Sequence, residues 1–185
     1  MNEHTTRLVA VVGTHGRATF PEPRGHMSDP TGPRFRTLDR DECVAILARN
    51  HVGRLAHARQ DRVDIEPLHY VYDGGWLYGR TSHGAKLESA GTRVRPVAFE
   101  VDEVEGLFSW RSVVVHGGFY TAEHDGAGDP GDAWSRGVEL LRTLVPATFT
   151  DADPAAFRTV LFRMAVQDVT GRAAVPGEAP ATPAG

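Results

Sequence analysis

Alternation of hydrophobic and polar residues predicts that most of this chain consists of β-strands. In one stretch, for example, Val97, Phe99 and Val101 alternate with smaller or charged residues. The predicted strands are Val52–Ala58, Val63–Tyr72, Trp76–Thr81, Val94–Asp102, Trp110–Thr121 and Val160–Val169. Because short turns join most neighbours, we expect antiparallel pairing and a small barrel with helices packed outside it.

The second and third of these strands are predicted to form a hairpin around Asp73-Gly74-Gly75, since these turn residues tolerate positive φ. Arg80, Thr81 and Ser82 follow at the end of the hairpin, and Lys86 lies shortly beyond them. Two cations and two hydroxyl groups together suit the binding of a phosphate. A solvated loop is the other interpretation of the same residues.

Helix signals occur before the first predicted strand and before the last one. Asp39 and Glu42 form a capping-box pattern, which predicts a short amphipathic helix running to about Asn50. Asp132 is predicted to open a second helix, which Pro146 ends. Two shorter helical segments are predicted at Gly84–Ala90 and after Asp153-Pro154.

The folded domain is predicted to span residues 34–171, between two disordered tails. Residues 1–33 are rich in Gly, Pro, Arg and His, and residues 172–185 are rich in Ala and Pro. We expect Met27, or a residue near it, to be the physiological start.

Composition narrows the classes of function. A formal net charge of −4 and a pI near 6.1 argue against nucleic acid as the main partner. The single cysteine, Cys43, cannot form an intrachain disulfide. No apolar run approaches the ~20 residues that a membrane helix needs, so we expect no membrane association and a cytoplasmic location.

Nine histidines raise the question of a metal site, but no two of them have the spacing of a helical H-E-x-x-H motif. We therefore predict no metal. The chain also lacks a Walker loop and a G-x-S-x-G elbow, which leaves hydrolase and nucleoside-triphosphatase functions without support.

Two groups of residues could meet a planar ligand. His69 lies on the strand beside the cationic loop and faces either a ligand or substrate, or else solvent or a dimer partner. Trp110, Arg111 and Ser112 begin a long strand and place an aromatic ring and a cation near an anionic ligand, or else the tryptophan closes one end of the barrel.

The region from Leu38 to about Gly118 resembles the pyridoxamine 5′-phosphate oxidase-like, FMN-binding split-barrel proteins, and is closest to the branch of Nim-type nitroimidazole reductases. The matching stretches are LDRDECVAILARNHVGRLA, DIEPLHYVYDGGWLYGRTSHGAKLE, VAFEVDEVEG and WRSVVVHGGFY, and LFRMAVQDVTGR is similar to the closing strand of that family. Their order and spacing make the resemblance specific.

The resemblance implies a mainly β fold, a six-stranded antiparallel split β-barrel with accessory helices. It also implies a homodimer with an FMN site at the subunit interface. In the family pattern, Thr81 and Lys86 hold the FMN phosphate, with Arg80 and Ser82 as helpers. The remaining residues that match flavin-contacting positions are Pro67, Leu68, His69, Tyr70, Trp110, Arg111 and Ser112.

Two departures from the family pattern argue against oxidation of vitamin B6. Glu66 and Pro67 stand where true pyridoxamine phosphate oxidases carry basic residues. The segment after Gly171 has Arg172 but no tryptophan, whereas those enzymes end in a segment that contains both. Fewer phosphate cations also point to weaker FMN retention or to the deazaflavin F420.

The sequence therefore predicts an FMN-dependent oxidoreductase that passes electrons from NAD(P)H to a small organic acceptor. His69 is the only candidate for acid–base chemistry, through its near-neutral pKa range. The alternatives are an F420-dependent reductase on the same fold, or a non-catalytic protein that binds flavin, or haem through His69 or His116.

Overall fold

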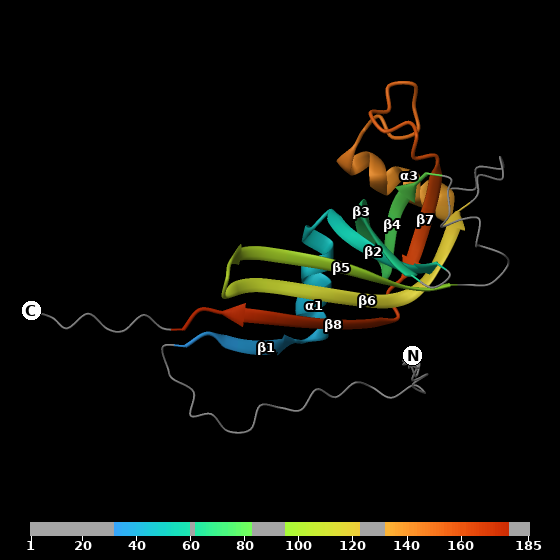
Figure 1. Ribbon diagram of the computed structural model, residues 1–185. Coiled ribbons are helices and arrows are strands. Elements are labelled where there is room, and N and C mark those ends of the chain that lie inside the picture. Colours follow the sequence, from blue (N-terminus) through green and yellow to red (C-terminus); the bar gives the residue numbers. More distant parts are fainter. Residues whose placement is uncertain (1–31, 60–61, 83–94, 123–131, 178–185) are drawn as a thin grey trace, which may run out of the picture. The chain divides into compact units, whose positions relative to one another are not determined.

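The computed structural model describes residues 32–59, 62–82, 95–122 and 132–177 (Figure 1). The predictions for the N-terminal tail up to residue 31, for the start at Met27 and for a helix at Gly84–Ala90 lie outside these residues. The same holds for Lys86.

One antiparallel sheet of eight strands dominates the domain. The strands are β1 (Arg34–Leu38), β2 (Val52–Arg59), β3 (Arg62–Asp73), β4 (Trp76–Thr81), β5 (Arg95–Gly106), β6 (Ser109–Ala122), β7 (Val160–Ala165) and β8 (Asp168–Val175). They are arranged in the order β1-β8-β6-β5-β2-β3-β4-β7, and β6 also pairs with β7. This last pairing closes six of the strands into a ring, so the predicted six-stranded antiparallel split barrel is confirmed.

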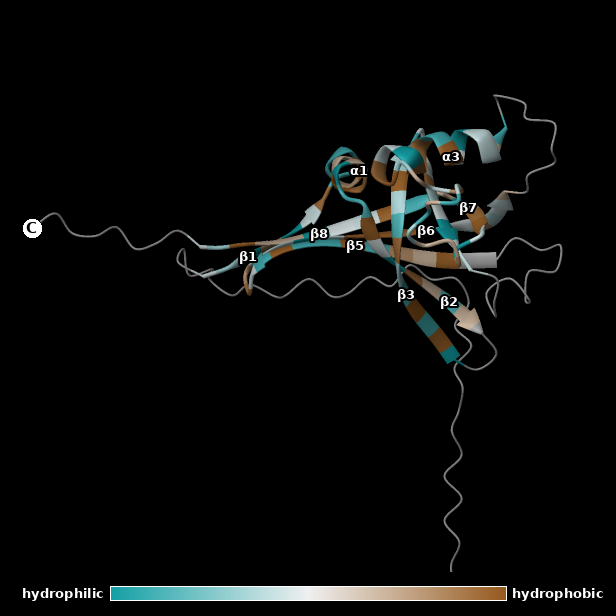
Figure 2. Ribbon diagram, turned by 90° about the horizontal axis from the view of Figure 1, so that it is seen from above, coloured by the Kyte–Doolittle hydropathy of each residue, from teal (hydrophilic) through white to brown (hydrophobic). Residues whose placement is uncertain are grey.

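The ring is incomplete between β2 and β5. Their pairing joins Arg54–Ala56 to Ala98–Glu100 and stops there, although β2 continues to Arg59 and β5 begins at Arg95. Figure 2 shows the β2–β3 pair running away from β5 and β6. We call the space between residues 57–59 of β2 and residues 95–97 of β5 the fork.

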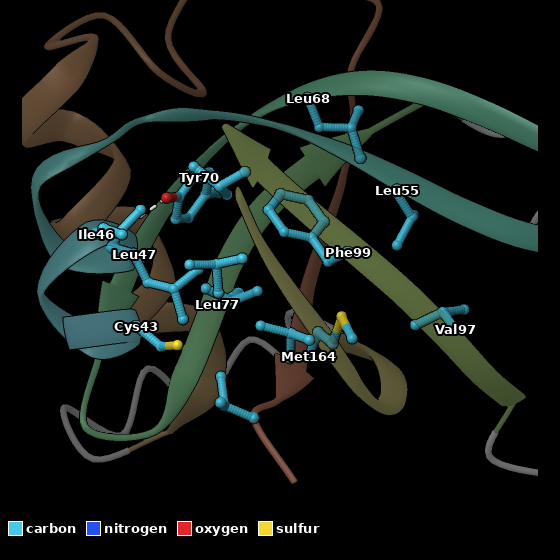
Figure 3. Close-up of a cluster of buried hydrophobic side chains, with 14 of the residues drawn as sticks. Cys43, Ile46, Leu47, Leu55, Leu68, Tyr70, Leu77, Val97, Phe99 and Met164 are labelled. Atoms are coloured by element: carbon cyan, nitrogen blue, oxygen red, sulfur yellow. Dashed lines mark hydrogen bonds between the residues drawn. The ribbon is translucent and has the colours of Figure 1, made fainter. Parts of the chain in front are cut away.

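Helix α1 (Arg40–Arg49) begins with the predicted capping box, in which the Asp39 carboxylate accepts a hydrogen bond from the Glu42 backbone and the Glu42 side chain accepts one from the Asp39 backbone. Its buried residues join the main core with side chains from β3, β4, β5 and β7 (Figure 3). Within that core the Tyr70 hydroxyl donates a hydrogen bond to the Leu47 carbonyl at 2.9 Å. This bond connects α1 to β3.

Helix α3 (Ala133–Leu144) is capped by Asp132, as predicted, and covers the opposite side of the ring. Leu141 of the helix packs with Val71 of β3 and Leu161 of β7 in a second, smaller core. The ring therefore has hydrophobic contacts on both sides in the region of β3, β4 and β7.

The C-terminal part differs from the prediction. The single strand predicted at Val160–Val169 is two strands, β7 and β8, and the predicted tail at 172–185 is wrong for its first four residues, because β8 runs to Val175. Ala173 and Ala174 are buried there. Alanine has little strand propensity of its own, so these residues are held by pairing with β1 and β6.

Two smaller differences concern the ends of the elements. Arg34–Leu38, which showed no strand signal, forms β1 against β8. Asp153-Pro154 does not open a helix, and the chain forms turns there instead. The Asp153 carboxylate accepts the Ala155 backbone N–H at 2.9 Å, which closes a local turn.

Candidate functional site

Strand β3 divides its four predicted flavin-contacting residues between two faces. Leu68 and Tyr70 point into the main core and are buried, whereas Pro67 and His69 are exposed. This is the ordinary alternation of a strand. The side chains of Pro67 and His69 thus lie on the side of the sheet that faces away from the core, which we call the outer face.

His69 lies beside the end of α3. It lines a small enclosed cavity of about 30 Å³ together with Arg80, Thr148 and Arg158, and with residues near Leu144. A space of this size holds about one water molecule. His69 therefore lies between polar neighbours and solvent. This geometry does not test its predicted acid–base role, which remains a prediction.

The predicted phosphate-binding group Arg80 has a carboxylate as its partner. Both terminal guanidinium nitrogens donate to Asp153, one of them at 2.8 Å, and both side chains are almost fully buried. The guanidinium also lies 5.6 Å from the centre of the Phe149 ring. This pairing holds the pKa of Asp153 well below its usual range. Arg80 therefore anchors the loop before β7, a role that the sequence did not indicate.

Thr81 and Ser82 complete the described part of the predicted phosphate end. Thr81 is buried and pairs with Val160 of β7, whereas Ser82 is exposed. Lys86 falls outside the described residues. Of the four predicted phosphate contacts, Ser82 is the one whose side chain the structure places in solvent.

The start of β6 also separates its predicted site residues. Trp110 and Ser112 lie on the outer face, because they alternate with the buried Val113 side of the strand. Arg111 points to the other side, where its guanidinium lies 3.7 Å from Glu103 and 3.8 Å from Glu105. An Arg111 contact to a ligand on the outer face is therefore not supported within one chain.

A polar band crosses the outer face from β6 to β3. The Ser112 hydroxyl donates to Glu100 at 3.1 Å, and Arg54 donates to both Glu100 and Asp102. Arg54 lies directly opposite Pro67 in the β2–β3 pairing. Ser112 and Pro67 are thus three strand spacings apart, about 14 Å. A small ring cannot contact both within one chain.

Large hydrophobic side chains flank this polar band. Val52, Val63, Ile65 and Val104 are 57%, 67%, 63% and 67% exposed. Isolated exposed hydrophobic residues are common, but several on one sheet face are typical of a surface that another molecule covers.

A cavity of about 530 Å³ lies at the fork, and its volume is within the usual range for ligand pockets. Of the residues that the sequence analysis proposed as ligand contacts, His116 is the one that lines this cavity. Its lining residues are Ala56, His57, Ala58, Val63, Val97, Ala98, His116, Gly117, Gly118, Gln167 and Asp168. The Ala and Gly residues of this set indicate in the sequence that space can remain between strands. The location of that space follows only from the strand pairing.

In the described part of the chain, no three or more His, Cys, Asp or Glu side chains gather closely enough to hold a metal ion. Nor does any described helix have the length and apolar character needed to cross a membrane.

Comparison with known proteins gives consistent matches. Residues 39–173 match the family model described as pyridoxamine 5′-phosphate oxidase. The crystal structure of an FAD-binding protein from Mesorhizobium loti is 31% identical with a TM-score of 0.62, covering 78% of this chain and 99% of that one. A candidate pyridoxamine 5′-phosphate oxidase from Corynebacterium glutamicum is 25% identical with a TM-score of 0.56, covering 77% and 99%.

An uncharacterized protein from Rhizobium meliloti is 32% identical over 82 residues, which make up 44% of this chain and 54% of that protein. The match spans about half the length of that relative.

Proposed function

Since the chain belongs to the pyridoxamine 5′-phosphate oxidase family, we propose that it is a flavin-binding oxidoreductase that holds FMN between two copies of itself. The observation that carries this proposal is the outer face of the split barrel. It brings the exposed Pro67 of β3 and the half-buried Ser112 of β6 onto one face, on which exposed hydrophobic side chains flank a polar band. The 31% identity to an FAD-binding protein supports the choice of a flavin.

A second copy supplies what one chain lacks. Pro67 and Ser112 lie on the same face but at opposite ends of the polar band, so one small ring cannot contact both in a single protomer. In a dimer with a two-fold axis, each patch on one copy meets the corresponding patch on the other. Ser112 of each protomer would then face β3 of its partner, and the exposed hydrophobic side chains would be buried.

The residues on β3 fit the ring of a flavin. Ile65 and Pro67 point outward from neighbouring positions of the same face and form an apolar surface. Thr81, Ser82 and Lys86 would hold the phosphate, while Arg80 keeps its carboxylate partner. When bound, the flavin supplies the redox chemistry, and the protein binds it, orients it and excludes water.

His69 is the candidate for holding or moving a proton on this face. It follows Pro67 by two positions, on the same face of the strand, and is exposed. NAD(P)H as the electron donor and a small organic molecule as the acceptor complete the proposed function. Membership of the Nim-type branch and the identity of the acceptor stay predictions.

The test combines a spectrum, a mass and an assay. We expect the purified protein to bind FMN with a saturable change in the flavin absorbance bands, to sediment as a dimer, and to oxidise NADH or NADPH when an acceptor is added. A deazaflavin spectrum would favour the F420-dependent reductase. FMN binding without turnover would favour a carrier.

Haem is the alternative that one specific feature favours, since His57 and His116 line the same cavity at the fork. Titration with haemin separates it from the flavin proposal, because haem bound through a histidine gives an intense Soret band. A monomer that binds neither flavin nor haem would contradict the proposed function altogether.

A further inference from the structure

The fork leaves backbone groups of two strands facing each other without pairing. The last β2–β5 pair is Ala56 with Ala98, and the next positions, His57 and Val97, are not paired with each other. β2 instead pairs with β3 up to Arg59, and β5 pairs with β6 from Arg95. In this region each strand is paired along one edge only. The backbone N–H and C=O groups on the other edge point toward the fork and can form hydrogen bonds with a ligand there.

Part of the wall of this cavity carries little side-chain bulk. Ala56, Ala58 and Ala98 carry a single methyl group each, and Gly117 and Gly118 have no side chain. At these five positions the wall consists of backbone and methyl groups, and the cavity has a volume of about 530 Å³. A flat ring can lie against a wall of this kind.

His57 is the unexplained polar group of the cavity. Its side chain is 11% exposed, and among the described residues neither ring nitrogen has a hydrogen-bond partner. The nearest acidic oxygen, on Glu66, is 4.0 Å from Nε2, which is beyond hydrogen-bond reach. A buried polar group without a partner destabilises the fold, so native proteins rarely leave one in place without a reason.

Both ring nitrogens of His57 are buried, so neither of them is open to the cavity in the observed orientation. A half turn about the Cβ–Cγ bond exchanges Nδ1 with Cδ2 and Nε2 with Cε1. The broad, two-fold torsional preference of this bond allows such a turn. The ring can in this way bring a donor or an acceptor to a molecule in the fork.

We propose that the fork cavity is a binding site for a small, uncharged, planar ring that carries an amide-like edge, and that His57 turns to bind it. An amide-like edge has an N–H donor next to a C=O acceptor, which can pair with the open strand edges, and a His57 ring nitrogen can add one further hydrogen bond. Asp168 in the lining, and Glu66 beside His57, make the site unfavourable for an anion. This inference does not depend on flavin binding.

Two sources could supply such a ring, namely the pyrimidine part of a flavin or a separate small molecule. The probe is therefore 2-quinolone, an uncharged bicyclic amide, titrated by calorimetry into the full-length protein with and without saturating FMN. Saturable binding that FMN abolishes assigns the cavity to the flavin ring. Binding that survives saturation with FMN assigns it to a separate ligand.

Two matched variants locate the binding. Val63 lines the cavity and Val52 does not, although both are exposed valines of the β2–β3 pair. We expect Val63→Trp to weaken 2-quinolone binding by about tenfold or more because indole fills the space, and Val52→Trp to leave it unchanged. His57→Phe, which keeps a ring but removes both nitrogens, should also weaken binding by about tenfold. Because Val63 is exposed, its variant remains informative even where His57→Phe does not fold.

A matched ligand tests the amide edge. N-methyl-2-quinolone has the same ring but no N–H donor, and we expect it to bind about tenfold more weakly than 2-quinolone. The inference is overturned by the absence of saturable 2-quinolone binding, by Val63→Trp binding it as well as Val52→Trp does, or by equal affinity for the methylated compound.

Discussion

Arg80 and Asp153 form a bidentate ion pair inside the protein, although 73 positions separate them in the chain. The two side chains are 8% and 2% exposed. The Asp153 carboxylate also accepts backbone N–H groups from Phe149 at 2.8 Å and from Ala155 at 2.9 Å. The pair therefore fixes the loop between α3 and β7 to the end of β4.

Replacing Asp153 by Asn should destabilise the fold strongly. The variant leaves the buried Arg80 charge without its counter-ion, and removal of one partner of a buried pair costs about 3–5 kcal/mol. Urea unfolding followed by tryptophan fluorescence would measure this, since Trp134 packs 5.0 Å from Phe149 in the same region.

An exposed pair provides the control. Arg136 and Glu139 are joined at 2.8 Å, but their side chains are 41% and 69% exposed. Glu139→Gln should therefore cost less than about 1 kcal/mol. Equal losses in the two variants would mean that the burial of the Arg80–Asp153 pair contributes nothing to stability.

The acid side of the stability curve should depend on Glu42. Its carboxylate accepts two hydrogen bonds from Arg36, at 2.9 and 2.7 Å, and one from the Asp39 backbone at 3.0 Å. These contacts lower the pKa of Glu42 from 4.5 to about 2. Because the folded state favours the charged form, the contribution is complete above pH 4.5 and is lost as the pH falls toward 2.

Glu42→Gln should for this reason lose less stability than the wild type between these two pH values. Urea midpoints measured at several points from pH 5 down to about 2 would show it as a flatter curve. Curves that run parallel over the whole range would show that the contacts of Glu42 do not affect folding.

The alternation of hydrophobic and polar residues predicted the strands of the ring, because this alternation is a local property of the sequence. The barrel then follows when strands that are neighbours in the chain pair with each other. The alternation did not predict β8, because Gly171, Ala173 and Ala174 have no strand preference of their own. The prediction ends the folded domain at Gly171, whereas a Cβ there would lie 2.6 Å from the Cys43 sulfur. The role of Gly171 depends on a helix more than a hundred residues away, which no local pattern records.

The candidate site was predictable only in part, for the same reason. The cationic residues after the hairpin suggested a phosphate for Arg80, since its carboxylate partner is distant in the chain. The position of Arg111 on the opposite face of β6 from Trp110 and Ser112 could have been predicted, because successive side chains of a strand alternate between its two faces. The fork could not be predicted, because it depends on the point at which two strands stop pairing.

Gly117 should be intolerant of any side chain. A Cβ at this position would lie 1.8 Å from the Ala165 carbonyl oxygen, a backbone atom that cannot move aside alone. Gly117→Ala should therefore lower the free energy of unfolding by about 1–3 kcal/mol or more, measured in urea. Gly106→Ala is the control, since nothing lies within 4 Å of a Cβ there. Similar midpoints for the two variants would argue against a close approach of β6 and the β7–β8 connection.

Lys86 should provide the phosphate charge that Arg80 does not. Asp153 already neutralises the Arg80 guanidinium, so the remaining cation among the predicted phosphate contacts is Lys86. Lys86→Ala should weaken FMN binding by roughly 1–3 kcal/mol through the loss of a charge-assisted contact. Riboflavin lacks the phosphate, so its affinity should not change. Quenching of flavin fluorescence measures both constants, and an unchanged ratio of FMN to riboflavin affinity would remove Lys86 from the site.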